Sequence, residues 1–210
     1  MKHDIALAVA KSLIEHLSGA FTRVEIAGSI RREKPEVKDI EIVAVPDLSP
    51  LPRPVPVFGQ PIPQWHKTKL DRILAEMVER QDAVLKMNGP RFKKIHLKYA
   101  GIWVDLFLNV PPSEWGVQAV IRTGPRDFSE WCVTNRSRGG ALPDGYFVRH
   151  QVVWVESEIE KQDVPDDQDK AKALLTATNH LLMPEEVDFL EFLGLGWIEP
   201  RIRRAMWRSY

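Results

Sequence analysis

Two acidic residues stand one position apart in an otherwise apolar stretch of the sequence. Asp39 and Glu41 alternate with apolar side chains over residues 39–45, which is the pattern of a strand with one buried face. Because alternate side chains of a strand point the same way, both carboxylates should project from one face, about 6.5 to 7 Å apart along the chain. Two carboxylates in this arrangement can share divalent cations.

A third acidic residue, Asp105, lies far downstream in the apolar run of residues 102–108. Taking an unpaired charge out of water into so apolar a strand is strongly unfavourable, because nothing replaces the lost hydration. Asp105 therefore requires either a metal ion or a cationic partner, and a metal would unite it with the acidic pair.

A glycine-serine segment precedes the acidic pair. Residues 24–27 indicate a strand that runs into Gly28-Ser29. These two small residues let the backbone turn tightly, so that a phosphate can approach main-chain N–H groups. Three carboxylates together with a phosphate-binding turn predict phosphoryl or nucleotidyl transfer.

The surrounding patterns predict the elements that must position these residues. Strands are predicted over 83–87, 92–99 and 102–109, with Ala100-Gly101 as a two-residue hairpin loop, and helices over 2–17 and 67–81. Later helices are predicted over 113–121, 126–136, about 168–178 and 185–193, with a strand pair at 146–149 and 152–155. The proline-dense residues 46–63 predict an extended loop, and Trp103 and Trp197 are expected in the core.

The charges are balanced overall but unevenly distributed. Lys plus Arg and Asp plus Glu each number 29, with basic residues in excess over 1–150 and acidic ones over 151–210. This split predicts a basic surface toward DNA and an acidic surface away from it. The single Cys132 excludes an internal disulfide and fits a reducing compartment. No apolar run approaches the ~20 residues of a membrane span, and we expect no signal peptide and no membrane partner.

Taken together, these motifs resemble those of a known group of enzymes. The sequence contains Gly-Ser-x-Arg-Arg, a six-residue spacer, Asp-x-Glu and a later strand Asp. This order of motifs is similar to the pattern of the nucleotidyltransferase superfamily. Within it, Thr123–Phe128 resembles the Thr-Gly-Ser block of the X-family DNA polymerases, the group of DNA polymerase beta. Residues 183–200 resemble the end of that family's thumb-like subdomain.

The resemblance implies an α+β fold with a palm-like mixed sheet and flanking helices over 1–124, and a mostly helical thumb-like subdomain over 125–210. It implies a minimal DNA polymerase that adds a deoxynucleotide to a DNA 3′-hydroxyl, filling short gaps. We expect two Mg²⁺ ions, with Mn²⁺ as the alternative, and a primer-template or gapped DNA and a dNTP as partners. We expect a monomer, located in the cytoplasm or encoded by a virus.

The same resemblance assigns roles to individual residues. The catalytic and metal-binding residues would be Asp39, Glu41 and Asp105, where Glu41 stands in place of the Asp usual in the family. The nucleotide-binding residues would be Gly28, Ser29, Arg32, Thr123 and Gly124. The DNA-binding residues would be Arg91, Lys93 and Lys94, which are placed on a strand edge, with Arg126 and Arg136. Arg31 and Lys34 are expected to be solvated.

Two other classes of function remain open at this stage. One is a transferase of the same fold that works without a template, on nucleic acid, protein or a small molecule. The other is a catalytically silent DNA-binding module. Three clustered carboxylates without a metal repel one another and weaken binding to DNA, which favours an enzyme over the silent module.

Overall fold

The computed structural model describes residues 1–49, 51, 68–110 and 114–206. The chain divides into two compact units. Unit 1 comprises Met1–Ile26 and Glu36–Leu108, and unit 2 comprises Ala27–Pro35 and Asn109–Tyr210. The glycine-serine segment therefore belongs to unit 2, although it lies between two parts of unit 1 in the sequence. The two units are not divided at residue 124. The boundary between palm and thumb at that residue stays a prediction.

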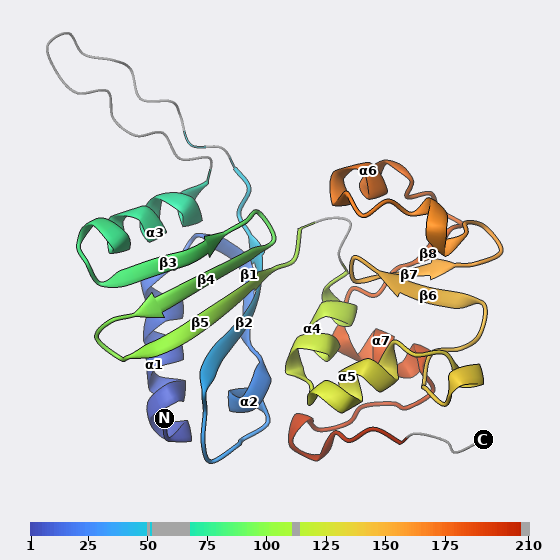
Figure 1. Cartoon of the computed structure of the whole chain (residues 1–210), viewed down its shortest axis with the longest axis horizontal. Helices are drawn as coiled ribbons and strands as arrows, with labels where there is room; N and C mark the ends of the chain where they lie inside the picture. The colour runs from blue at the N-terminus through green and yellow to red at the C-terminus, as the bar shows by residue number, and fades with distance from the viewer. Residues whose placement is uncertain (50, 52–67, 111–113, 207–210) are drawn as a thin grey trace, which may run out of the picture. The chain divides into compact units, whose positions relative to one another are not determined.

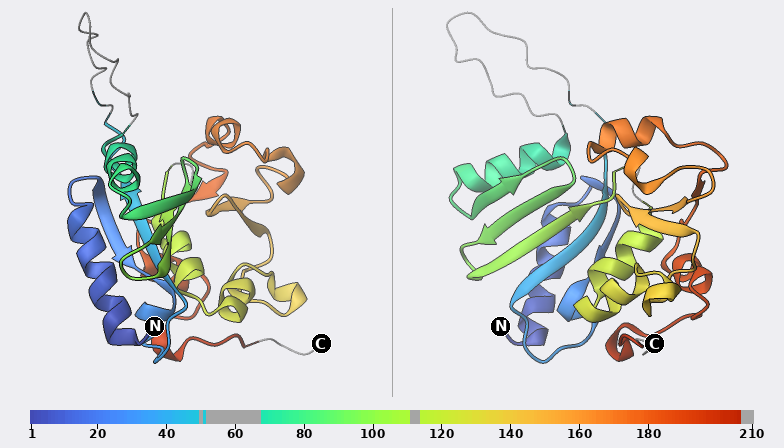
Figure 2. Two further views of the ribbon diagram at one scale, coloured as in Figure 1. Left: turned by 60° about the vertical axis from the view of Figure 1, so that its left-hand side comes forward. Right: turned by 45° about the vertical axis from the view of Figure 1, so that its right-hand side comes forward.

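Unit 1 is a five-stranded mixed sheet with two helices on one face (Figures 1 and 2). The strands are β1 (Phe21–Ile26), β2 (Asp39–Pro46), β3 (Ala83–Asn88), β4 (Phe92–Leu97) and β5 (Ile102–Leu108), in the order β1-β2-β5-β4-β3. β2 and β5 are parallel, whereas the other neighbours are antiparallel. The helices are α1 (His3–His16) and α3 (Lys69–Glu79). The predicted α+β class and mixed sheet are confirmed.

Alternation along the strands explains why only one face of this sheet is covered. Burial alternates strictly along β4 and β5, with Ile95, Leu97, Val104 and Leu106 buried. These side chains share the helix-covered face with buried residues of α1 and α3, which form the core of unit 1. The intervening side chains, Asp105 among them, belong to the other face of the sheet.

Helix α3 begins where the sequence supplies a cap. The Thr68 hydroxyl accepts a hydrogen bond from the Asp71 backbone N–H at 3.2 Å, which satisfies one of the open donors of the first turn.

The hairpin between β4 and β5 differs from the expected two-residue loop, because Leu97 pairs with Ile102 and residues 98–101 form the connection. The Gly101 N–H donates to the Leu97 carbonyl at 2.8 Å, with Gly101 at φ +61°.

Unit 2 combines a cluster of short helices with a small sheet (Figure 1). The helices are α2 (Gly28–Arg31), α4 (Trp115–Thr123), α5 (Arg126–Cys132), α6 (Gln168–Ala173) and α7 (Glu186–Phe192), with 3₁₀ turns η1 (Arg136–Arg138), η2 (Lys161–Asp163) and η3 (Pro200–Ile202). The strands are β6 (Tyr146–Arg149), β7 (Val152–Val155) and β8 (His180–Leu181), in that order. Val117, Phe128, Phe189 and Leu190 lie at the centre of the unit's main core.

Three elements of unit 2 differ from the sequence prediction. Gly28 and Ser29 begin the short helix α2, with Gly28 at φ +60°, where a tight turn was expected. Helix α5 ends at Cys132, before the predicted residue 136, because the Trp131 carbonyl accepts hydrogen bonds from Thr134 and Ala141 as the chain turns back. Helix α6 ends at Ala173 because the Asn179 side chain binds the Leu174 carbonyl and the Thr176 N–H, and the unpredicted β8 follows.

Some sequence predictions lie outside the described residues. They include the extended loop from residue 52 to residue 63 and the beginnings of the helices predicted from 67 and 113.

In the described part of the chain, every helix is too short or too polar to cross a lipid bilayer. Trp197 is 48% exposed and therefore does not belong to the core, contrary to expectation.

Candidate active site

The three predicted catalytic acids lie on one face of the sheet of unit 1. Glu41 on β2 is paired with Asp105 on the parallel neighbour β5, and Asp39 is paired with Trp103. Paired residues of adjacent strands share a face and lie on backbones about 4.8 Å apart. Glu41 and Asp105 are therefore direct neighbours, with Asp39 one step along the same face, as the alternation in each strand predicted.

Lys94 provides the cationic partner that Asp105 requires. It is paired with Asp105 across the antiparallel β4–β5 ladder, and its Nζ lies 2.7 Å from Asp105 Oδ1. The two side chains are 24% and 15% exposed, so this ion pair is partly shielded from water. Lys94, Asp105 and Glu41 thus form a row of charges across three adjacent strands.

Lys93 points to the opposite face and is not the surface cation that the sequence suggested. It is only 3% exposed, and its ammonium donates to Asp71 Oδ1 of α3 at 2.8 Å and to the Asn88 side chain. β4 is an inner strand between β3 and β5, not a sheet edge. A buried ammonium cannot displace counterions from a phosphate backbone, so Lys93 is not a DNA contact.

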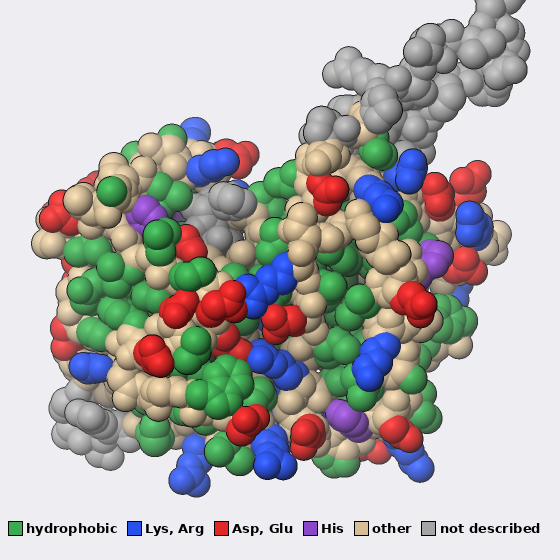
Figure 3. Space-filling model, turned by 180° about the vertical axis from the view of Figure 1, so that it is seen from behind, with side chains coloured by type: hydrophobic (Ala, Val, Ile, Leu, Met, Phe, Trp, Pro, Cys, Tyr) green, Lys and Arg blue, Asp and Glu red, His purple; other side chains and the backbone are tan. Residues whose placement is uncertain are grey.

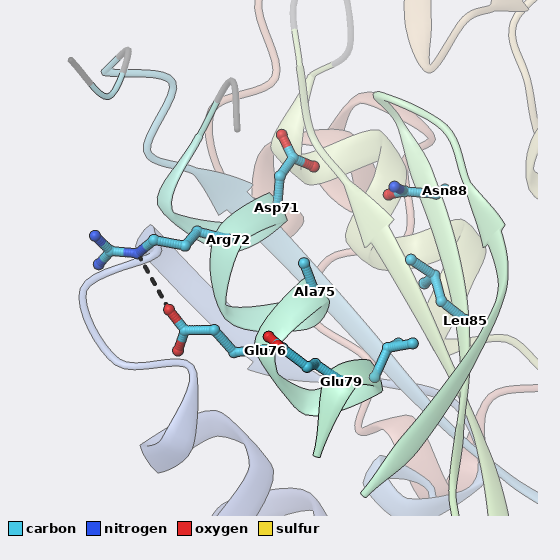
Figure 4. Close-up of a pocket in the computed structure, with 8 residues that line it drawn as sticks. Asp71, Arg72, Ala75, Glu76, Glu79, Leu85 and Asn88 are labelled. Atoms are coloured by element: carbon cyan, nitrogen blue, oxygen red, sulfur yellow. Dashed lines mark ion pairs between the residues drawn. The ribbon is translucent and has the colours of Figure 1, made fainter. Parts of the chain in front are cut away.

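The pair of Lys93 with Asp71 perturbs the acid. Burial alone would raise the pKa of Asp71, but hydrogen bonds from Lys93 and Thr68, with the charge of Lys93, outweigh burial and hold the pKa below its ordinary value. A pocket between α3 and β3 is lined by Asp71, Arg72, Glu76 and Glu79 (Figure 4). Because α3 covers the face opposite Asp105, this pocket is separate from the predicted catalytic acids.

An aromatic ring that the sequence assigned to the core lies beside the acids. Trp103 is only partly buried and shares the face of Asp105, two residues along β5. The His96 ring lies 4.9 Å from it, and the ammonium groups of Lys86 and Lys94 lie 5.5 and 5.7 Å from its centre. These distances are in the range of cation–π contacts. The alternation along β5 that places Asp105 on the face without helices also places Trp103 there. The sequence pattern was therefore sufficient to predict the face on which Trp103 lies.

The donor set suits a hard divalent ion. Carboxylate oxygens are the protein ligands that Mg²⁺ prefers, and the pairing of Glu41 with Asp105 offers oxygens from two adjacent strands. Within the described ranges, no three His, Cys, Asp or Glu side chains converge tightly enough to enclose an ion. The acids therefore share a face and a register, but their side chains do not form a closed metal cage.

The predicted nucleotide-binding residues gather in unit 2. Arg32 donates from Nη1 to the Thr123 carbonyl oxygen, at the end of α4. Gly124 follows at φ +67°, and a Cβ atom added there would lie 3.0 Å from Arg32 Nη1. A side chain at position 124 would therefore be strained and would crowd the guanidinium. The hydrogen bond from Arg32 thus joins the end of α2 to the Thr123-Gly124 turn. This agrees with the prediction that these residues bind the same nucleotide.

The hydroxyl oxygen of Ser29 is buried at the start of α2. Of the described side chains, Ser29 is one whose oxygen is buried and finds no hydrogen-bond partner. A buried hydroxyl without a partner costs free energy, and such atoms call for a specific explanation. A phosphate oxygen would accept its hydrogen bond, which agrees with the predicted nucleotide contact.

Arg31 is not a solvated surface residue, contrary to expectation. Its guanidinium donates to Thr123 Oγ1 at 2.8 Å and to Glu186 Oε2 at 2.5 Å. The other oxygen of Glu186 accepts from Arg203 Nη1 at 2.6 Å, and the Arg203 side chain is 0% exposed. This Arg31–Glu186–Arg203 triad links α2, α7 and the residue that follows η3. Sequence reasoning missed it because its members are far apart in the chain.

The remaining basic residues of the DNA-binding prediction differ in their surroundings. Arg126 is 92% exposed and pairs with Glu130 one turn along α5, with Nε 2.7 Å from Oε1. Arg136 donates to the carbonyls of Ala141 and Leu193, which braces the chain after α5 against the end of α7. Arg91 immediately precedes β4 and is partly buried. On the face drawn in Figure 3, basic and acidic side chains are interspersed. These DNA contacts stay predictions.

Comparison with known proteins identifies the fold. No protein-family model matches the sequence, and neither does any curated protein. Among solved structures, a ternary P/T complex of Leishmania infantum polymerase beta matches with a TM-score of 0.63 and 17% identity, over 97% of this chain and 76% of that one. A ternary gap complex of the same polymerase matches with a TM-score of 0.66 and 15% identity, over 97% and 70%. The chain has a DNA polymerase beta-like fold.

Proposed function

We propose that this chain, which has a DNA polymerase beta-like fold, is a nucleotidyltransferase that adds a dNTP to a DNA 3′-hydroxyl and releases pyrophosphate, acting on short gaps. The observation that supports this most is the pairing of Glu41 with Asp105 on the face that also carries Asp39. Two adjacent acids and a third on the same face are what a metal-dependent transfer requires. A silent DNA-binding module would gain nothing from them.

Each acid has a distinct part in the proposed reaction. Asp39 and Glu41 would hold two Mg²⁺ ions, and Asp105 would complete the ligands of the ion nearest the attacking hydroxyl. When bound, these ions lower the pKa of the 3′-hydroxyl and neutralise charge on the triphosphate. Asp105, whose carboxylate is partly shielded from water, would also accept the hydroxyl proton.

The residues gathered in unit 2 are proposed to bind the nucleotide. The Ser29 hydroxyl donates a hydrogen bond to a phosphate oxygen, which would satisfy its buried oxygen. Arg32 grips phosphate oxygens with its planar guanidinium. Gly124, where a side chain would crowd Arg32, would border the sugar of the nucleotide.

Primer extension tests this proposal and separates it from its rivals. A labelled primer is supplied alone, on a template and across a one-nucleotide gap, with each dNTP and each rNTP. We expect the strongest incorporation across the gap, with the templated dNTP. Extension of the single strand without template selection would indicate a template-independent transferase. Extension of no DNA by the metal-loaded protein would reject the polymerase proposal.

A further inference from the structure

Lys94 stands at one end of the charge row that contains two of the proposed metal ligands. The register places Lys94 opposite Asp105 on one side of β5, and Glu41 beside Asp105 on the other. The ammonium group contacts Asp105 Oδ1 at 2.7 Å, so one oxygen of this carboxylate already has a cationic partner. Without a metal, Lys94 offsets part of the repulsion between the acids.

We propose that Lys94 is a built-in counter-ion that competes with the divalent metal for Asp105. The proposal rests on the proposed function, because it takes Asp105 to be a metal ligand. An ammonium and a divalent ion at the same carboxylate repel each other, and the partly shielded setting weakens screening by water. Lys94 on Oδ1 therefore opposes loading of the metal at this carboxylate, and it sets the metal concentration at which the site fills.

Trp103 offers the displaced ammonium a second position on the same face. The Lys94 ammonium already lies 5.7 Å from the centre of the Trp103 ring, while still bound to Asp105. A small rotation of the side chain would exchange the carboxylate for the ring face, which attracts cations. Lys86 lies over the same ring at 5.5 Å. It therefore provides a matched control that alters the ring contact but not the ion pair of Lys94 with Asp105.

Direct measurement of Mn²⁺ binding tests the competition. Binding to the full chain is followed by electron paramagnetic resonance of free Mn²⁺ for wild type, Lys94→Met, Lys94→Arg and Lys86→Met. We expect Lys94→Met to bind at least tenfold more tightly than wild type, and Lys94→Arg and Lys86→Met to bind within about twofold of it. In EDTA, Lys94→Met should unfold at a lower temperature than wild type. Addition of Mn²⁺ should raise the unfolding temperature of Lys94→Met by more than it raises that of wild type.

The outcomes separate this inference from the proposed function. If wild type binds Mn²⁺, Asp105→Asn abolishes that binding, and Lys94→Met binds no more tightly than wild type, the competition is refuted while the metal site stands. If none of the proteins binds Mn²⁺, both proposals fail. Should Lys94→Met not fold in EDTA, Lys94→Gln replaces it, because its amide can still donate to Asp105 without carrying charge. The same tenfold criterion then applies.

Discussion

Glu41 and Asp105 occupy paired positions on the parallel strands β2 and β5, although 63 residues separate them in the sequence. Parallel pairing in this register places both side chains on the face that the helices leave uncovered. A slip of one residue in either strand would move one acid to the helix-covered face, among buried residues such as Ile40 and Val104. The register of the sheet is therefore what brings the two acids together.

Removal of one acid should abolish transfer without unfolding the protein. Glu41→Gln is expected to lower the rate of nucleotide addition by at least about 1,000-fold, equivalent to about 4 kcal/mol of lost transition-state stabilisation. Glu76→Gln, on the surface of α3, is the control and should retain wild-type activity. Single-turnover primer extension measures both. Near-normal extension by Glu41→Gln would remove Glu41 from the catalytic group.

Arg32 should act on the nucleotide more than on DNA. Arg32→Ala is expected to weaken dNTP binding by about 1.5 to 3 kcal/mol, or roughly 10- to 150-fold in Kd, through loss of a charge-assisted contact. Arg126→Ala, at an exposed position of α5, should instead weaken DNA binding and lower its salt dependence. Separate titrations with dNTP and with gapped DNA measure the two effects. Equal losses of both ligands in Arg32→Ala would place Arg32 in the DNA groove.

The Arg31–Glu186–Arg203 triad should be necessary for the stability of unit 2. Glu186→Gln leaves the fully buried Arg203 without its carboxylate partner, so we expect a loss of about 3 to 5 kcal/mol in the free energy of unfolding. Glu191→Gln, exposed on the same helix, should change it by less than about 0.5 kcal/mol. Urea denaturation monitored by tryptophan fluorescence compares them. Equal stability of the two variants would show that the triad contributes little.

The ion pair of Lys93 with Asp71 should make stability depend on pH. The pKa of Asp71 is lower in the folded protein than its ordinary value of 3.8, so the unfolded chain binds the proton more tightly. The contribution of the pair is therefore fully present above pH 3.8 and is lost as pH falls through the lower folded value. Lys93→Met should cost about 3 kcal/mol at neutral pH.

Unfolding experiments on Lys93→Met and wild type across this range check the sign. The difference in stability between them should shrink as the pH falls below 3.8. Lys98→Met, at an exposed position, should follow wild type throughout. A difference that stays constant into acid would mean that Lys93 stabilises by packing and not through Asp71.

Local patterns in the sequence were sufficient to predict the strands of unit 1 and the face of each acid. The alternation of acidic and apolar residues over 39–45 placed Asp39 and Glu41 correctly relative to one another. The same reasoning could have placed Lys93, because it shares its phase with Ile95 and Leu97, which are both buried. The two adjacent lysines concealed this phase.

Long-range pairings could not be predicted in the same way. Nothing local to Arg31 indicates Glu186, which lies 155 residues away and meets it only after folding. The contact of Lys94 with Asp105 depends on the register of β4 against β5, and hence on a four-residue hairpin loop where a two-residue loop was expected. The sequence showed that Asp105 needed a cation, but not which residue provides it.

The proposed polymerase activity is tested most directly by single-turnover nucleotide addition to a one-nucleotide gap in Mg²⁺, measured for wild type and Asp105→Asn together with release of pyrophosphate. Wild type should add one templated deoxynucleotide and release pyrophosphate in equal amount, and Asp105→Asn should do so at least about 1,000-fold more slowly. Addition by Asp105→Asn at a rate near that of wild type would contradict this proposal.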